Sequence, residues 1–301
     1  MKSNLKRRAK ELAVRSANSS LGSSPRMTKE ILRTLRIEYS GNPGRIRTEG
    51  ARKAHCCITI DFDVTVPSRF EDNRKGTFAL LGLADKHQIP VTWAVCGKSA
   101  EGDMKSFSAI SDSSTNYEIG VHTYSHIDAS ASTRDTFLAD LERCIQVLGL
   151  RSPRSFVFPW NRESHHDVLV ELGFKAFRGK KRAIGFPAKE SGLWNIRPVY
   201  YVDQKSLGAE SLIKAYIDLC ISNSATFHLW SHPWSLPING RTEPMAATIG
   251  SVFEYLEEKR NEGTIDTLTM GSLASLLEFS AAQPLAPPGR SAFEAAQSVS
   301  H

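Results

Sequence analysis

The chain has 301 residues, of which 41% are hydrophobic and 23% charged, an ordinary composition for a globular protein. It contains no run of about 18 apolar residues, which argues against a membrane-spanning helix. Its five cysteines include no CxxC pair, which argues against a disulfide framework or a zinc ribbon. The net charge of +6 is concentrated in residues 1–50, which hold twelve Lys and Arg against four Asp and Glu.

We predict that residues 1–50 form a basic, partly flexible N-terminal arm. Residues 1–25 are basic and then rich in Ser, Gly and Asn, as flexible segments are, and residues 27–39 have the apolar spacing of one helix. No apolar stretch follows the basic residues as in a secretory signal, so a cytoplasmic location is expected. The arm suits an anionic surface, and the lack of interleaved aromatic residues argues against specific nucleic-acid binding.

From His55 onward, predicted strands alternate with predicted helices. Alternating units of this kind form parallel sheets. About seven of them over residues 51–280 predict an α/β fold, a distorted or incomplete (β/α) barrel, and residues 281–301 are predicted to be a disordered tail. The expected strands are 55–61, 90–95, 117–122, 155–158, 174–177, 225–230 and 266–269, and the expected helices are 76–87, 133–148, 165–172, 209–221, 245–262 and 271–279.

Residues suited to catalysis or metal binding lie where several of these strands end. Asp61 and Asp63 end the first strand, His122 and His126 follow the third, and His232 follows a late strand. Active sites of βα barrels gather at the carboxyl ends of the strands. We therefore expect these side chains to meet.

Two histidines four residues apart, joined by a carboxylate, form the usual ligand set of a catalytic Zn2+ that keeps one position open for water. An HxxxH pair alone is a weak signal and is more often structural, and the chain has a second such pair at His228 and His232. The nearby carboxylates strengthen the first pair. Two close carboxylates repel each other, so a cation at Asp63 would relieve the repulsion and leave Asp61 free as a base.

These segments, in this order, resemble the motifs of the polysaccharide deacetylase family, the NodB-homology or carbohydrate esterase family 4 fold. Thr59-Ile-Asp-Phe-Asp63 resembles the family's Asp-rich strand end, and His122-Thr-Tyr-Ser-His126 matches its His-[Ser/Thr]-x-x-His motif. Phe156-Val-Phe-Pro-Trp160 resembles the third motif, and Leu229-Trp-Ser-His232-Pro resembles the last. The resemblance covers about residues 55–279, and four motifs in order are more specific than any one.

The resemblance implies a metal-dependent deacetylase. Asp63, His122 and His126 would hold one divalent ion, Zn2+ or alternatively Co2+ or Ni2+. Such an ion lowers the pKa of water and polarises an amide carbonyl. Asp61 would be the general base, and His232 the general acid that protonates the departing amine.

The implied substrate is an N-acetylated amino sugar in a polysaccharide, an oligosaccharide or its precursor. The backbone N–H near Trp160 would help bind the oxyanion, and Trp160 or Trp234 would line the acetyl pocket. Two alternatives stay open. One is hydrolysis of a small non-sugar amide or cyclic imide on the same fold, and the other is a barrel that binds carbohydrate without catalysis.

The chain departs from the family pattern at two places. Val157 stands where the third motif of the family carries an Arg that orients the catalytic Asp, and Arg154 and Arg162 are the nearby candidates to replace it. The Asp-x-x-Asp-Trp element of the family has no clear counterpart, and its nearest candidate is Tyr201-Val-Asp203. The partners that orient the general base and the general acid are therefore not assigned by the sequence.

Overall fold

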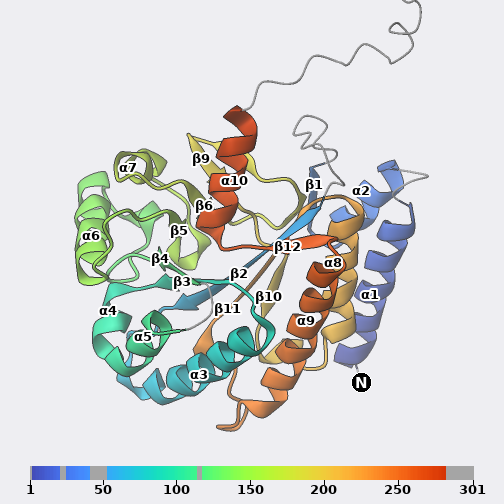
Figure 1. Ribbon diagram of the computed structural model, residues 1–301, viewed down its shortest axis with the longest axis horizontal. Coiled ribbons are helices and arrows are strands. Elements are labelled where there is room, and N and C mark those ends of the chain that lie inside the picture. The colour runs from blue at the N-terminus through green and yellow to red at the C-terminus, as the bar shows by residue number, and fades with distance from the viewer. Residues whose placement is uncertain (1, 21–24, 41–52, 114–116, 283–301) are drawn as a thin grey trace, which may run out of the picture.

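A computed structural model of the chain describes residues 2–20, 25–40, 53–113 and 117–282. Its main feature is a 10-stranded, curled sheet in the order β10-β11-β2-β3-β4-β5-β6-β9-β8, with β12 also paired to β2. All pairings in this sheet are parallel except that of β8 with β9. Helices surround the outer face of the curl (Figure 1). The predicted α/β fold, an incomplete barrel, is confirmed.

The strands and helices follow one another as the alternating pattern predicts, with additional short elements. The strands are β1 (Glu38–Ser40), β2 (Ala54–Phe62), β3 (Val91–Val95), β4 (Tyr117–Val121), β5 (Ser155–Val157), β6 (Ala176–Arg178), β7 (Ala183–Gly185), β8 (Ala188–Glu190), β9 (Leu193–Asn195), β10 (Tyr200–Val202), β11 (Thr226–Ser231) and β12 (Ile265–Thr267). The helices are α1 (Lys2–Ser20), α2 (Pro25–Thr34), α3 (Phe70–His87), α4 (Gly97–Gly102), α5 (Met104–Ser111), α6 (Arg134–Val147), α7 (His166–Glu171), α8 (Glu210–Ser222), α9 (Glu243–Asn261) and α10 (Met270–Ala282).

The structure differs from the sequence prediction mainly at short or polar elements. Helix α3 begins at Phe70 rather than at Gly76, because its first residues are mostly polar and show no apolar periodicity. Strands β7 to β10 have three residues each, too few to show a period of two. The predicted helix over 27–39 ends at Thr34, and β1 then pairs with β7.

The first 25 residues, predicted to be flexible, are largely helical in the structure. Helix α1 packs along α8 and α2, with Val14 and Ala17 fully buried, and it lies at the outer edge of the molecule in Figure 1. The Arg7 guanidinium donates a hydrogen bond of 2.6 Å to the Leu207 carbonyl. Val14 and Ala17 are only three residues apart and form a narrow apolar stripe. A stripe of two residues is too short to predict from the sequence that α1 packs against the domain. Residues 41–52 of the predicted arm and residues 283–301 of the predicted tail lie outside the described residues.

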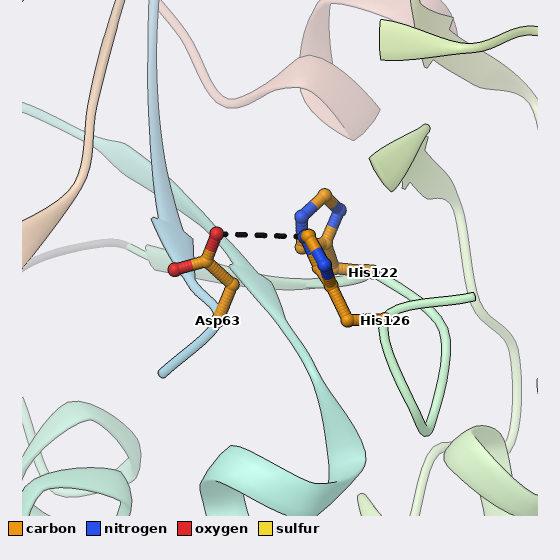
Figure 2. Close-up of side chains that lie close together, drawn as sticks. All are labelled: Asp63, His122 and His126. Carbon is orange, nitrogen blue, oxygen red and sulfur yellow. Dashed lines mark ion pairs between the residues drawn. The ribbon is translucent and has the colours of Figure 1, made fainter. Parts of the chain in front are cut away.

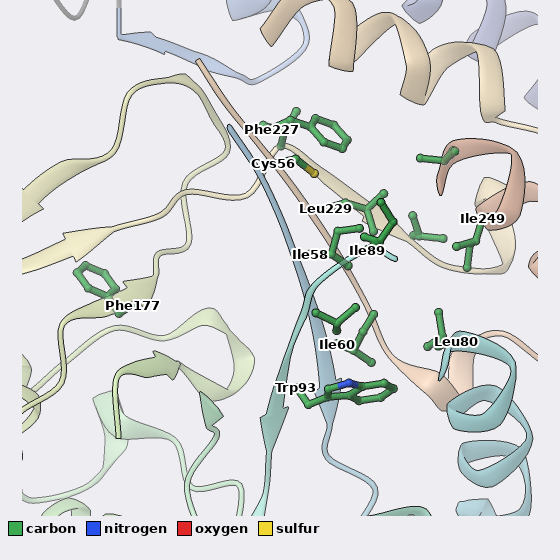
Figure 3. Packing of buried hydrophobic residues seen from close by; sticks show 14 of the residues in the cluster. Cys56, Ile58, Ile60, Leu80, Ile89, Trp93, Phe177, Phe227, Leu229 and Ile249 are labelled. Atoms are coloured by element: carbon green, nitrogen blue, oxygen red, sulfur yellow. The ribbon is translucent and has the colours of Figure 1, made fainter. Parts of the chain in front are cut away.

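Strand β2 divides the core by its alternating side chains. Cys56, Ile58 and Ile60 point outward toward the helices, where Ile58 and Ile60 lie near Leu80 of α3 and Ile249 of α9 (Figure 3). All are at least nine-tenths buried. Burying each side chain of this size stabilises the fold by about 1.5–3 kcal/mol.

The inner face of the curl has an apolar end and a polar end. Side chains of α10 pack with inner-face residues of the sheet, in a cluster made of Cys57, Ala94, Val157, Ala176, Trp194, Ile196, Met270, Leu273, Ala274 and Leu277. Further along β2 the same face carries Thr59 and Asp61. The apolar cluster closes one end, so any site inside the curl lies at the carboxyl ends of the strands. Among the described helices, none combines the length and the apolar character that a membrane span needs.

Candidate active site

A cavity of about 770 Å³ opens at the carboxyl ends of the parallel strands. It brings together the seven residues to which the sequence analysis gave a catalytic, metal-binding or substrate-binding role. These residues come from β2, the segment after β4, the turn after β5, and the segment after β11, and they are Asp61, Asp63, His122, His126, Trp160, His232 and Trp234.

Asp63, His122 and His126 form a compact group of potential metal ligands. One ligand atom from each lies within 4.8 Å of the others, and Figure 2 shows the carboxylate facing the two imidazoles. The His126 Nε2 lies 3.5 Å from Asp63 Oδ2. The His122 Nδ1 donates a hydrogen bond of 2.7 Å to the Val157 carbonyl, which leaves Nε2 as its free nitrogen. Two imidazoles and one carboxylate with such an oriented ring fit a Zn2+-type ion.

The turn between the two histidines is fixed by Asp140 of α6. The Asp140 carboxylate accepts hydrogen bonds from the backbone N–H groups of Tyr124, at 2.6 Å, and Ser125, at 3.2 Å. Within this turn Thr123 and His126 have φ of 62° and 59°, in the left-handed region that costs non-glycine residues energy. The clamp from α6 holds this strained backbone, and no sequence signal pointed to Asp140.

Asp61 is paired with a residue that the sequence did not predict. The Arg178 guanidinium, at the end of β6, donates to both Asp61 oxygens at 2.7 and 2.5 Å, and both side chains are at most 3% exposed. Burial would raise the pKa of the Asp61 carboxyl, but the Arg178 charge and hydrogen bonds hold that pKa below its usual value. Asp61 is therefore a carboxylate at neutral pH.

Arg178 replaces the missing motif arginine from the neighbouring strand. In the register of β5 and β6, Val157 is paired directly with Arg178, so their side chains lie on the same face of the sheet. The two candidates proposed from the sequence do not contact Asp61. Arg154 donates to Ser275 Oγ, and Arg162 pairs with Asp128. The available signal was an arginine directly after the predicted segment 174–177.

A buried chain of hydrogen bonds supports Arg178 from behind. Its Nη1 also donates to Thr59 Oγ1 at 2.8 Å, and Thr59 Oγ1 lies 3.1 Å from His228 Nε2. The His228 Nδ1 lies 2.9 Å from the Ile196 carbonyl, which can only accept, so Nδ1 carries the proton and Nε2 accepts from Thr59. Burial and the Arg178 charge lower the pKa of His228 to about 3, so its ring is neutral.

His232 lies between the two carboxylates and a phenol. Its Nε2 is 3.3 Å from Asp63 Oδ2 and 3.8 Å from Asp61 Oδ2, and its Nδ1 is 3.1 Å from Tyr201 Oη. Burial opposes the charged imidazolium, but the hydrogen bond and charge of Asp63 raise the His232 pKa above its usual value. Asp203, in the segment nearest to the missing motif, instead accepts from the Lys205 N–H at 2.9 Å. The partner of His232, which the sequence did not assign, is therefore Tyr201.

The two tryptophans differ in their surroundings. The Trp234 indole N–H donates to Asp63 Oδ1 at 2.8 Å, so this residue holds a candidate ligand besides lining the cavity. The Trp160 side chain is 65% exposed and lies edge-on to His126, with ring centroids 4.9 Å apart. Its backbone has a φ of 57°, and its N–H makes no hydrogen bond to the described part of the chain.

Comparisons with known proteins concern the family and the fold of the chain. The family model described as polysaccharide deacetylase matches residues 51–176. No curated protein matched the sequence.

Solved structures of similar fold include two that are described as polysaccharide deacetylases. The one from Mycobacterium smegmatis has a TM-score of 0.63 and 19% identity, covering 81% of this chain and 97% of that chain. The one from Pseudomonas aeruginosa PAO1 has a TM-score of 0.61 and 13% identity, covering 78% and 93%. Puue allantoinase has a TM-score of 0.60 and 13% identity, covering 81% and 96%. At these identities the likeness concerns the fold.

Proposed function

We propose, from the match of residues 51–176 to the polysaccharide deacetylase family model, that the chain is a metal-dependent hydrolase of this family. It removes an N-acetyl group from an amino sugar in a polysaccharide, an oligosaccharide or its precursor. One observation carries the proposal. A single cavity holds an Asp-His-His ligand group, a carboxylate locked by an arginine, and a further histidine.

Asp63, His122 and His126 would hold the ion, and Trp234 would keep the Asp63 carboxylate oriented through its indole N–H. A bound divalent ion supplies Lewis-acid polarisation of the acetyl carbonyl and a lower pKa for water. Zn2+ suits the two nitrogens and one oxygen, with Co2+ and Ni2+ as alternatives.

The remaining residues divide the proton transfers. Asp61, ionised and held by Arg178, takes the proton from the attacking water. The Trp160 N–H donates to the oxygen on which negative charge develops. His232, which lies 3.8 Å from Asp61 Oδ2 and 3.1 Å from Tyr201 Oη, delivers a proton to the leaving amine.

The shape of the cavity supports an extended, hydroxylated substrate. The cavity shares Asn161 with a polar hollow of about 570 Å³ on one side, and Arg69 and Trp234 with another of about 430 Å³. The two hollows therefore adjoin the cavity that holds the candidate metal group. The exposed Trp160 ring offers an apolar face of the kind on which a sugar ring can stack.

The domain boundaries remain part of the proposal. We assign residues 51–280 to the catalytic barrel, residues 1–50 to a basic arm that contacts an anionic surface, and residues 281–301 to a tail.

The test is a substrate panel assayed with the zinc-loaded protein. It contains N-acetylated amino-sugar oligomers, small non-sugar amides and a cyclic imide, and both acetate release and ring opening are followed. We expect acetate only from the oligomers. Ring opening without acetate release would favour the small-amide reading instead, and sugar binding without any product would favour a non-catalytic barrel.

A further inference from the structure

Trp230 of β11 lies between Arg178, which contacts Asp61, and Tyr201, which contacts His232. Its side chain lines the catalytic cavity. The Arg178 guanidinium carbon lies 4.2 Å from the centre of the Trp230 ring, within the range of a cation–π contact. The Tyr201 ring centre lies 4.2 Å from the same ring, with 30° between the two planes.

Arg178 and Tyr201 each contact one of the two proposed proton-transfer residues as well as Trp230. Arg178 holds both oxygens of Asp61, and Tyr201 places its Oη 3.1 Å from His232 Nδ1. Trp230 itself lies edge-on to His232, with ring centres 5.4 Å apart. One indole therefore contacts both side chains that orient the base and the acid.

Arg178 depends on this contact because its other restraints are incomplete. The guanidinium is fixed through Nη1 and Nη2, which bond to Thr59 and Asp61. Its Nε is buried and has no hydrogen-bond partner in the described structure. The Trp230 ring, 4.2 Å from the guanidinium carbon, supplies a further contact that restrains the Arg178 side chain besides these hydrogen bonds.

Tyr201 depends on the same ring for a similar reason. It lies on the edge strand β10, which has β11 as its one neighbour in the sheet. In the register of these strands Tyr201 is paired with Trp230. The neighbouring indole, at 30° to the phenol plane, restrains the phenol and thus the direction of its hydroxyl toward His232.

We propose that Trp230 is a positioning residue that aligns both proton-transfer groups at once, acting on Asp61 through Arg178 and on His232 through Tyr201. The proposal rests on the proposed deacetylase function and adds to it. A ring that only lined the substrate cavity would affect substrate binding. A ring that aligns both groups acts on the chemical step.

The kinetic test compares Trp230→Leu, which removes the aromatic face, with Trp230→Phe, which keeps one. We expect Trp230→Leu to lower kcat about 10- to 100-fold, with KM within about twofold and zinc content unchanged. Trp230→Phe should recover most of kcat. Adding Tyr201→Phe or Arg178→Lys to Trp230→Leu should cost less than it does in the wild type, because coupled residues are not additive. A rise in KM alone, or additive losses, would overturn the proposal.

A second readout needs no substrate. Side-chain ¹⁵N spectra of arginine- and histidine-labelled, zinc-loaded protein report the Arg178 guanidinium and the His232 ring directly. We expect Trp230→Leu to broaden or shift both signals, and Trp230→Phe to shift them less. If both signals stay unchanged in Trp230→Leu, the positioning role is wrong. If they change but no substrate of the panel is hydrolysed even by the wild type, the positioning stands and the proposed function fails.

Discussion

At the scale of single residues, the two aspartates of β2 and its end have separate partners. Asp61 accepts from Arg178 through both oxygens, whereas Asp63 accepts from Trp234 and faces three histidines. A carboxylate already locked by a guanidinium is poorly placed to become a metal ligand as well. This difference supports the assignment of Asp61 as base and Asp63 as ligand.

Asp61→Asn tests that assignment. The amide cannot take a proton from water, so kcat should fall by about 10²- to 10⁴-fold, while zinc content measured after dialysis should stay near one ion per chain. His126→Ala is the matched control, because it should lose the metal along with activity. Loss of zinc in Asp61→Asn with retention in Asp63→Asn would reverse the two roles.

At the scale of elements, the pairing of β5 with β6 explains how the site compensates for Val157. Neighbouring strands present a row of side chains at each register position, and Val157 and Arg178 share one row. An arginine on β6 can therefore reach Asp61 from the same row as an arginine on β5 would. In this chain the cation that pairs with Asp61 comes from β6, the neighbour of β5.

An exchange across this row gives a direct prediction. Arg178→Val should nearly abolish activity and cost about 3–5 kcal/mol of stability, because it leaves the buried Asp61 unpaired. The double variant Val157→Arg with Arg178→Val should recover part of both, since the new guanidinium starts from the adjacent strand. Acetate release and urea unfolding of the two variants provide the measurement. Equal loss in both would show that the row is not interchangeable.

Helix α3 sets the position of the turn that carries Trp234. A Cβ added at Gly76 would lie 1.9 Å from the Pro233 carbonyl oxygen, at the start of the turn Pro233–Ser235. Gly76→Ala should push this turn and its neighbour His232 away, lowering both kcat and the free energy of unfolding, the latter by about 1–3 kcal/mol.

The same helix offers its own control. Gly82 has nothing within 4 Å of an added Cβ, so Gly82→Ala should raise the unfolding free energy by about 0.5–1 kcal/mol with unchanged activity. If Gly76→Ala were as well tolerated as Gly82→Ala, the turn would not depend on close packing with α3.

At the scale of the whole molecule, the buried, neutral His228 makes the free energy of unfolding depend on pH. The His228 pKa in the fold is about 3, whereas an unfolded histidine titrates near its ordinary value of 6.5. Between these values the unfolded chain binds a proton that the folded chain does not. The contribution of His228 to the free energy of unfolding is therefore fully present above about pH 6.5, and it is lost as the pH falls toward 3.

His228→Gln isolates this contribution. The variant loses buried hydrogen bonds at every pH, but it has no imidazole to protonate. Its free-energy deficit relative to wild type should shrink by about 2 kcal/mol between pH 7.5 and pH 5. Urea unfolding in the presence of a chelator, which removes the effect of bound metal, measures this difference. Two parallel curves would contradict the prediction.

The sequence predicted the long strands and helices of the barrel, because their apolar periodicity extends over several turns or alternations. It also predicted that the seven candidate residues would meet, and all seven line one cavity, because each lies near or just after the carboxyl end of a strand. Their roles stay a prediction. The sequence could not predict Arg178, Tyr201 or Asp140. Their roles depend on which strands are neighbours, on register and on a turn clamped by α6, and none of these leaves a local pattern.

Arg178 lies outside the segment that matches the family model, and this matters for a chain that is shortened to that segment. The matched residues 51–176 contain the three candidate metal ligands and Asp61, and they end two positions before Arg178. The strand that flanks β2 on its other side, β11, and the helix that closes the inner end, α10, also come later. In the proposed enzyme, a truncated product ending there would keep the three candidate ligands without Arg178, Tyr201 and His232. The residues proposed to bind the metal and those proposed to assist proton transfer therefore lie in different halves of the sequence.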